Sequence, residues 1–106
     1  MMKSMLEFFN FGKNITYKYL EFFINPNMPI SLQEDNLCED MIQMSYSNNY
    51  TLDVGWYPAH NISGRFVIRV IYQYDWENPK LIYECRDVAA VESYLDKCVK
   101  YITQFQ

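Results

Sequence analysis

The chain contains few of the residues that most catalytic and metal-binding sites require. Its single histidine, His60, excludes a metal site with two or three histidine ligands. Its three cysteines are an odd number and form no Cys-x-x-Cys pair, so neither a disulfide framework nor a zinc site is indicated. Its three glycines stand far apart, which leaves no glycine-rich loop to hold a phosphate. We therefore expect no cofactor, no metal and no enzymatic activity.

Long apolar runs are also missing. No stretch approaches the ~20 consecutive apolar residues that cross a bilayer. The N-terminus does not resemble a secretory signal, because Glu7, Asn10 and Lys13 interrupt it. Unpaired thiols fit a reducing compartment. We expect a cytoplasmic protein without a membrane partner, and its 106 residues, half of them hydrophobic, predict a single domain spanning 1–106.

Cations are absent from one long stretch. Between Lys18 and Arg65 there is no lysine or arginine, although the chain has nine in total. The same stretch carries six acidic residues: Glu21, Glu34, Asp35, Glu39, Asp40 and Asp53. Such a segment repels nucleic acids and membrane surfaces and favours a basic partner. The simpler interpretation is a solvated helix face that only confers solubility.

The second half of the sequence has clear periodicity. Alternating apolar residues predict strands over Tyr50–Tyr57, Phe66–Tyr74 and Leu81–Arg86, joined by short turns as an antiparallel meander. Asp87 is a good N-cap for a closing helix. Its apolar residues recur at helical spacing and predict a buried stripe: Val88, Val91, Leu95, Cys98 and Ile102.

The first half of the sequence is less clear. Capping-box patterns at Ser4–Glu7 and Ser31–Glu34 predict helix starts, and Asn14 is suited to cap a helix that ends near Ile24. The second capping box favours a helix from Ser31 to about residue 45 that carries four acidic residues, with a strand over Met41–Tyr46 as the alternative. The expected fold is α+β, with N-terminal helices, a three-stranded or larger antiparallel β-meander, and a C-terminal amphipathic helix packed on the sheet.

Aromatic residues form 18% of the chain. Stacking on nucleic-acid bases is disfavoured, because Arg65, Arg69 and Arg86 are too few against the acidic stretch. Tyrosine and tryptophan also anchor protein interfaces, and Trp76 lies in a turn that is easy to present. The candidate binding residues form an acidic group and a second patch: Glu34, Asp35, Glu39 and Asp40, then Asp53, Tyr57, Asp75, Trp76 and Glu77.

Three segments carry a family resemblance. Residues Leu52–Pro58, Gly64–Phe66 and Asp75–Pro79 resemble the CdiI-type immunity proteins of bacterial contact-dependent growth inhibition, a polymorphic-toxin system. The likeness covers about residues 50 to 87. It implies a cytoplasmic protein that binds and neutralises the toxin domain of its own system, and many such toxins are nucleases with basic surfaces.

The function expected from the sequence is therefore that of an immunity protein. Its partner would be the C-terminal domain of a cognate toxin, with a nuclease favoured, and binding would occlude that domain by electrostatic and aromatic contacts. Two alternatives stay open. One is an acidic adaptor or nucleic-acid mimic that binds another basic protein, and the other is a small enzyme that uses His60 with a nearby carboxylate.

Overall fold

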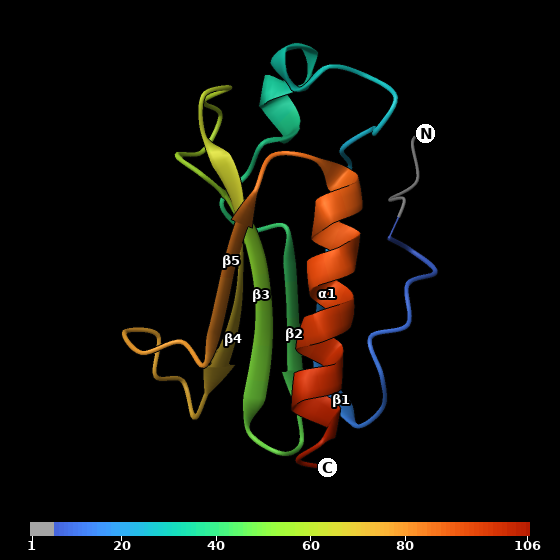
Figure 1. Cartoon of the computed structure of the whole chain (residues 1–106), viewed down its shortest axis with the longest axis vertical. Helices are drawn as coiled ribbons and strands as arrows, with labels where there is room; N and C mark the ends of the chain where they lie inside the picture. The colour runs from blue at the N-terminus through green and yellow to red at the C-terminus, as the bar shows by residue number, and fades with distance from the viewer. Residues whose placement is uncertain (1–5) are drawn as a thin grey trace.

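A computed structural model describes residues 6–106 and places them in two layers (Figure 1). Five antiparallel strands lie side by side in chain order: β1 (Ile15–Leu20), β2 (Ile42–Tyr46), β3 (Tyr50–Tyr57), β4 (Arg65–Tyr72) and β5 (Leu81–Cys85). The helix α1 (Val88–Thr103) packs against β3, β4 and β5 on one face of the sheet. Within the described residues this is an α+β fold, as the sequence predicts.

The closing helix begins where the sequence predicts. The Asp87 side chain accepts a hydrogen bond of 2.8 Å from the backbone amide of Ala90, which satisfies a free amide of the first turn. Every residue of the predicted apolar stripe is buried: Val88, Val91, Leu95, Cys98 and Ile102. No helix among the described residues has the length and apolar character needed to span a bilayer.

The core lies between α1 and the sheet face that it covers. Alternate residues of β3 and β4 point into the core, and the rings of Trp56 and Phe66 meet edge to face with 4.8 Å between their centroids. The N-terminal segment runs along α1 on the side away from β5 (Figure 1). This segment contributes Leu6 and Phe11 to the core, and the Tyr46 hydroxyl donates a 2.6 Å hydrogen bond to the Phe11 carbonyl.

The prediction of helices before residue 25 is wrong within the described residues. Asn14 does not cap a helix, because it precedes the edge strand β1, in which Tyr17 pairs with Ser45 and Tyr19 with Gln43. Thr16, Tyr17 and Tyr19 are residue types that favour a pleated strand. The Ser4–Glu7 capping box begins outside the described residues.

The helix predicted from Ser31 to about residue 45 is also wrong. The chain there makes two short 3-10 turns, Ile30–Leu32 and Glu34–Asn36, and neither has a side-chain cap. The buried Gln33 carboxamide ties this segment to the preceding loop, since it accepts from the Asn25 amide at 2.7 Å and donates to the Asn25 and Met28 carbonyls at 2.9 Å. The segment then enters β2, close to the strand expected as the alternative.

Candidate functional site: the open sheet face and the acidic bulge

The sheet face opposite α1, called the open face here, is not covered by a helix of the described chain. One row of side chains crosses all five strands on this face, each paired in register with the next: Tyr19, Gln43, Asp53, Arg69 and Ile82. The sequence predicts that Asp53, Gly55 and Tyr57 share the face of β3 opposite its core residues, and the structure agrees. The row mixes aromatic, acidic and amide groups, which is a composition suited to binding rather than to a core.

Asp53 is the buried centre of this row. Its residue is only 6% exposed, and the nearest Arg69 guanidinium nitrogen lies 3.9 Å from its carboxylate. The guanidinium carbon of Arg69 also lies 5.1 Å from the centre of the Tyr57 ring. Burial raises the pKa of Asp53 from 3.8 to about 6, because the effect of Arg69 is smaller and Asp40 adds a second negative charge.

Glu39 and Asp40 form a bulge beside this row. The Trp56 amide donates to the Cys38 carbonyl at 2.8 Å, and the Met41 amide donates to the Val54 carbonyl at 3.1 Å. The two acidic residues between these bonds are therefore excluded from regular pairing with β3. The bulge requires Gly55, because any β-carbon there would collide with the Glu39 carbonyl oxygen.

The bulge places two exposed carboxylates at the rim of the open face. No ion pair within residues 6–106 involves Glu39 or Asp40. Burial raises the pKa of Tyr57, with Glu39 a smaller contribution in the same direction. The charge of Asp40 likewise contributes to raising the pKa of Asp53. The fold therefore gathers four predicted binding residues into one negative region, called the acidic rim here: Glu39, Asp40, Asp53 and Tyr57.

Glu34 and Asp35 lie in the second 3-10 turn and are exposed. His60 links the β3–β4 loop to this segment, since its backbone amide donates to the Leu37 carbonyl at 2.7 Å and its Nδ1 lies 3.0 Å from the Glu34 carbonyl oxygen. A carbonyl can only accept, so Nδ1 carries a proton in this contact. His60 thus connects two loops at the end of the sheet where the acidic turn lies.

Arg86 holds the same β3–β4 loop from the other side. Its guanidinium donates to the Gly64 carbonyl and, at 2.8 Å, to the Ile62 carbonyl, and it lies 5.5 Å from the centre of the Trp56 ring. The Trp56 indole N–H donates to the Asn61 carbonyl at 2.7 Å. These bonds order a loop that is otherwise largely exposed.

Replacing Arg86 with alanine should lower the free energy of unfolding by about 1–2 kcal/mol, because two carbonyls lose a charged donor. Lysine should not restore the loss, since it cannot reach both carbonyls with one planar group. Arg65→Ala is the matched control, because its ion pair with Glu84, at 3.6 Å, is exposed. Urea unfolding would measure both variants, and equal effects would contradict the assigned role.

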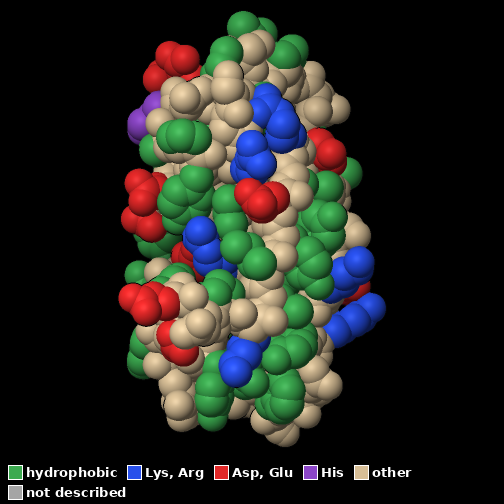
Figure 2. Space-filling model, turned by 60° about the vertical axis from the view of Figure 1, so that its left-hand side comes forward, with side chains coloured by type: hydrophobic (Ala, Val, Ile, Leu, Met, Phe, Trp, Pro, Cys, Tyr) green, Lys and Arg blue, Asp and Glu red, His purple; other side chains and the backbone are tan. Residues whose placement is uncertain are grey.

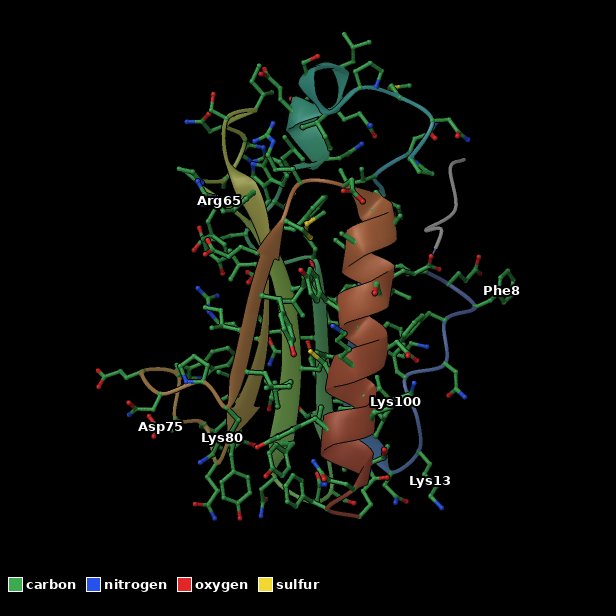
Figure 3. The ribbon with its side chains drawn as sticks, viewed as in Figure 1. Phe8, Lys13, Arg65, Asp75, Lys80 and Lys100 are labelled. Atoms are coloured by element: carbon green, nitrogen blue, oxygen red, sulfur yellow. The ribbon has the colours of Figure 1, made fainter. Side chains whose placement is uncertain are left out.

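Asp75, Trp76 and Glu77 lie in the β4–β5 loop, at the end of the sheet opposite to Arg65 (Figure 3). Trp76 is 43% exposed, and the Asn78 amide bonds both carboxylate oxygens of Asp75 at 3.2 Å. The structure therefore separates these three predicted residues from the acidic rim. Figure 2 shows acidic side chains recurring down one margin of its view, with apolar side chains between them.

The sequence interpretation missed four residues of the open face: Tyr17, Tyr19, Gln43 and Arg69. The helix predicted after Asn14 includes Tyr17 and Tyr19, although Ile15, Tyr17 and Tyr19 alternate with polar residues or leucine. That period-two pattern is the signal that could have identified an edge strand. The alternation of residues 66–74 predicts that Arg69 points away from the apolar face of its strand, as it does, but its contacts with Asp53 and Tyr57 depend on register, which the sequence does not specify.

No cluster of three histidine, cysteine or acidic side chains in the described part of the chain is arranged to hold a metal ion. Cys98 is buried, and burial raises the pKa of its thiol to about 12 and that of Cys85 to about 11, so both resist forming thiolates. No family model, curated protein or solved structure matches this chain.

Proposed function

We propose that the protein is a cytoplasmic immunity protein that binds a basic toxin domain and neutralises it by occlusion. The observation that carries this proposal is the acidic rim next to a sheet face that no helix of the described chain covers and that carries an exposed tyrosine, Tyr17. Glu39 and Asp40 present charges that no cation of the described chain pairs with, and Asp53 adds a carboxylate that Arg69 only partly compensates. Such a surface has a negative electrostatic potential, which a positively charged partner would complement.

The composition of the open face supports protein binding over mere solubility. Tyr17 is 52% exposed and Ile82 is 53% exposed, so apolar and aromatic area accompanies the charge. Interfaces combine aromatic anchors with a polar rim in this way. A face that served only solubility would not need exposed tyrosine and isoleucine beside its acids.

The nature of the partner rests on the resemblance of residues 50–87 to CdiI-type immunity proteins. A nuclease toxin is favoured, because an enzyme that handles phosphates presents the cations that the acidic rim lacks. An acidic adaptor for another basic protein would use the same surface. The two differ only in the partner, so identification of the partner decides between them.

Substituting lysine for both Glu39 and Asp40 should slow association with the partner about tenfold or more at low salt and flatten its salt dependence. The probe is the C-terminal domain encoded by the gene directly upstream, used in stopped-flow binding and in a nuclease assay. The matched control is Glu92→Lys with Asp96→Lys, the same charge change on the exposed side of α1. Equal slowing by both pairs would remove the acidic rim from the interface. No binding and no inhibition by the unmodified protein would contradict the proposed function.

A further inference from the structure

A hollow of about 190 Å³ lies beside the acidic rim and is lined by Tyr17, Tyr19, Asp40 and Gln43. We propose that this hollow binds an arginine side chain supplied by the basic partner. The inference rests on the proposed function in one respect, since the partner is the source of the arginine. The hollow itself is defined by residues of β1, β2 and the bulge.

The protein already holds one arginine in the same chemical setting. Arg69 lies between the Asp53 carboxylate, at 3.9 Å, and the face of the Tyr57 ring, at 5.1 Å. In the same row of the open face, Tyr19 pairs with Gln43, and Gln43 pairs with Asp53. The hollow on that side of Asp53 again offers a carboxylate and tyrosine rings, but no arginine or lysine lines it. The hollow therefore has the same kinds of groups as the Arg69 site but lacks the arginine.

The hollow lies next to carboxylates whose charge no neighbouring cation among the described residues balances. Burial raises the pKa of Tyr19, and the neighbouring carboxylates Glu21 and Asp40 raise it further, with no cation acting against them. The closest basic residue in sequence, Lys18, shares the opposite face of β1, in register with Met44 of the core. Arg69 is already engaged by Asp53 and Tyr57.

Arginine fits the lining groups better than lysine. A guanidinium is flat, so it can stack on a tyrosine ring while its edge donates to a carboxylate. Asp40 supplies that carboxylate, and the Gln43 carboxamide oxygen supplies a further acceptor. A lysine ammonium would gain the charge attraction without the planar contact.

The test uses the full chain and two short peptides whose side chains have nearly the same shape, one charged and one neutral. An acetylated, amidated Gly-Arg-Gly peptide and its citrulline counterpart are titrated into the ¹⁵N-labelled protein. The arginine peptide should shift the backbone signals of Tyr17 and Tyr19 and the side-chain amide of Gln43, with at least tenfold tighter binding than citrulline. Equal binding of the two peptides would overturn the inference, as would shifts confined to other surfaces.

Variants locate the site. Asp40→Asn should weaken arginine-peptide binding about tenfold, and Tyr19→Leu should weaken it severalfold. Glu92→Gln is the matched control, because it removes an exposed charge from α1 and should leave binding unchanged. The spectra also report whether each variant is folded. Equal weakening by Asp40→Asn and Glu92→Gln would mean a nonspecific charge effect and would overturn the site.

The outcome for the hollow is separable from that for the proposed function. If the protein neutralises the upstream toxin domain but neither peptide distinguishes Asp40→Asn from Glu92→Gln, the arginine site fails and the function stands. If the arginine peptide binds as expected but the protein binds no toxin domain, the site stands and the function fails.

Discussion

Replacing Gly55 with alanine should lower the free energy of unfolding by about 3 kcal/mol or more. Gly55 lies in the middle of β3, where an added β-carbon would overlap the Glu39 carbonyl oxygen and approach the Tyr57 ring to 3.0 Å. Backbone cannot yield as a flexible side chain can. The bulge must therefore lift away from β3, which breaks the hydrogen bonds of Cys38 and Met41 that frame it.

Gly12→Ala provides a matched control for this prediction. An added β-carbon at Gly12 would meet Thr103 and Val99 at 3.4 and 3.5 Å, which is close to ordinary contact. Its φ of +87° makes alanine strained there, at a cost of about 1 kcal/mol. Urea unfolding should therefore rank Gly55→Ala well below Gly12→Ala in stability. A Gly55→Ala loss no larger than that of Gly12→Ala would mean that the bulge is not tied to β3.

The Gly55 variant also connects fold to function. Glu39 and Asp40 reach the open face only because β3 has no side chain beneath the bulge. Under conditions in which Gly55→Ala remains folded, the acidic rim should be displaced and binding of a basic partner should weaken. The close approach of the Gly55 and Glu39 backbones would thus support both stability and binding, and its loss would lower both.

The elements that could be predicted from the sequence are those with strong periodicity. The strand predicted over Tyr50–Tyr57 matches β3, and the stripe of α1 from Val88 to Ile102 is buried as predicted. In both segments the apolar pattern fits one type of structure only. Local pattern and tertiary packing agree there, so the sequence was sufficient.

The errors fall where local patterns fit two structures. Met41, Ile42 and Met44 fit a helical stripe, but Ile42, Met44 and Tyr46 also alternate as a strand, and pairing with β1 and β3 decides for the strand. The Ser31–Glu34 capping box is a local signal, and it is overridden by the bonds of Gln33 to Asn25 and Met28. Strand pairing and side-chain hydrogen bonds of this kind leave no trace in the spacing of residues.

The candidate site could likewise be predicted only in part. Counting charges identifies the acidic residues, but only the bulge brings Glu39 and Asp40 to Asp53. The acidic helix face expected for Glu34 to Asp40 does not exist, because those residues lie in a 3-10 turn and a bulge. Asp75 and Glu77 look equivalent to them in the sequence but lie at the other end of the sheet.

Replacing Asp53 with asparagine should stabilise the protein above pH 6 by up to about 3 kcal/mol. The pKa of Asp53 is raised from 3.8 to about 6 by burial, with Asp40 adding to it and Arg69 opposing it. The folded state therefore holds this proton more tightly than the unfolded state does. Each pH unit between the two values corresponds to about 1.4 kcal/mol, so the contribution of Asp53 to stability is highest below pH 4 and declines as pH rises to 6.

Asparagine keeps the shape of the side chain without its titration. The stability difference between Asp53→Asn and the unmodified protein should be smallest near pH 3.5, grow through pH 4–6 and level off above pH 6. Asp96→Asn is the matched control, because it makes the same change at an exposed carboxylate, 2.9 Å from the Lys100 ammonium. Urea unfolding at closely spaced pH values measures both. A constant difference for Asp53→Asn would mean that Arg69 fully compensates the buried charge.

The same titration links stability to binding. A cation brought to the open face by a partner would favour the ionised form of Asp53 and lower its pKa. Binding between pH 5 and 7 should then release a proton, and affinity should rise with pH through about 6 if the partner itself does not titrate there. In Asp53→Asn the proton release should disappear, which calorimetry in buffers of different ionisation enthalpy would detect. Proton release that persists in this variant would place the titrating group elsewhere, because the variant no longer carries the carboxylate whose pKa burial raises to about 6.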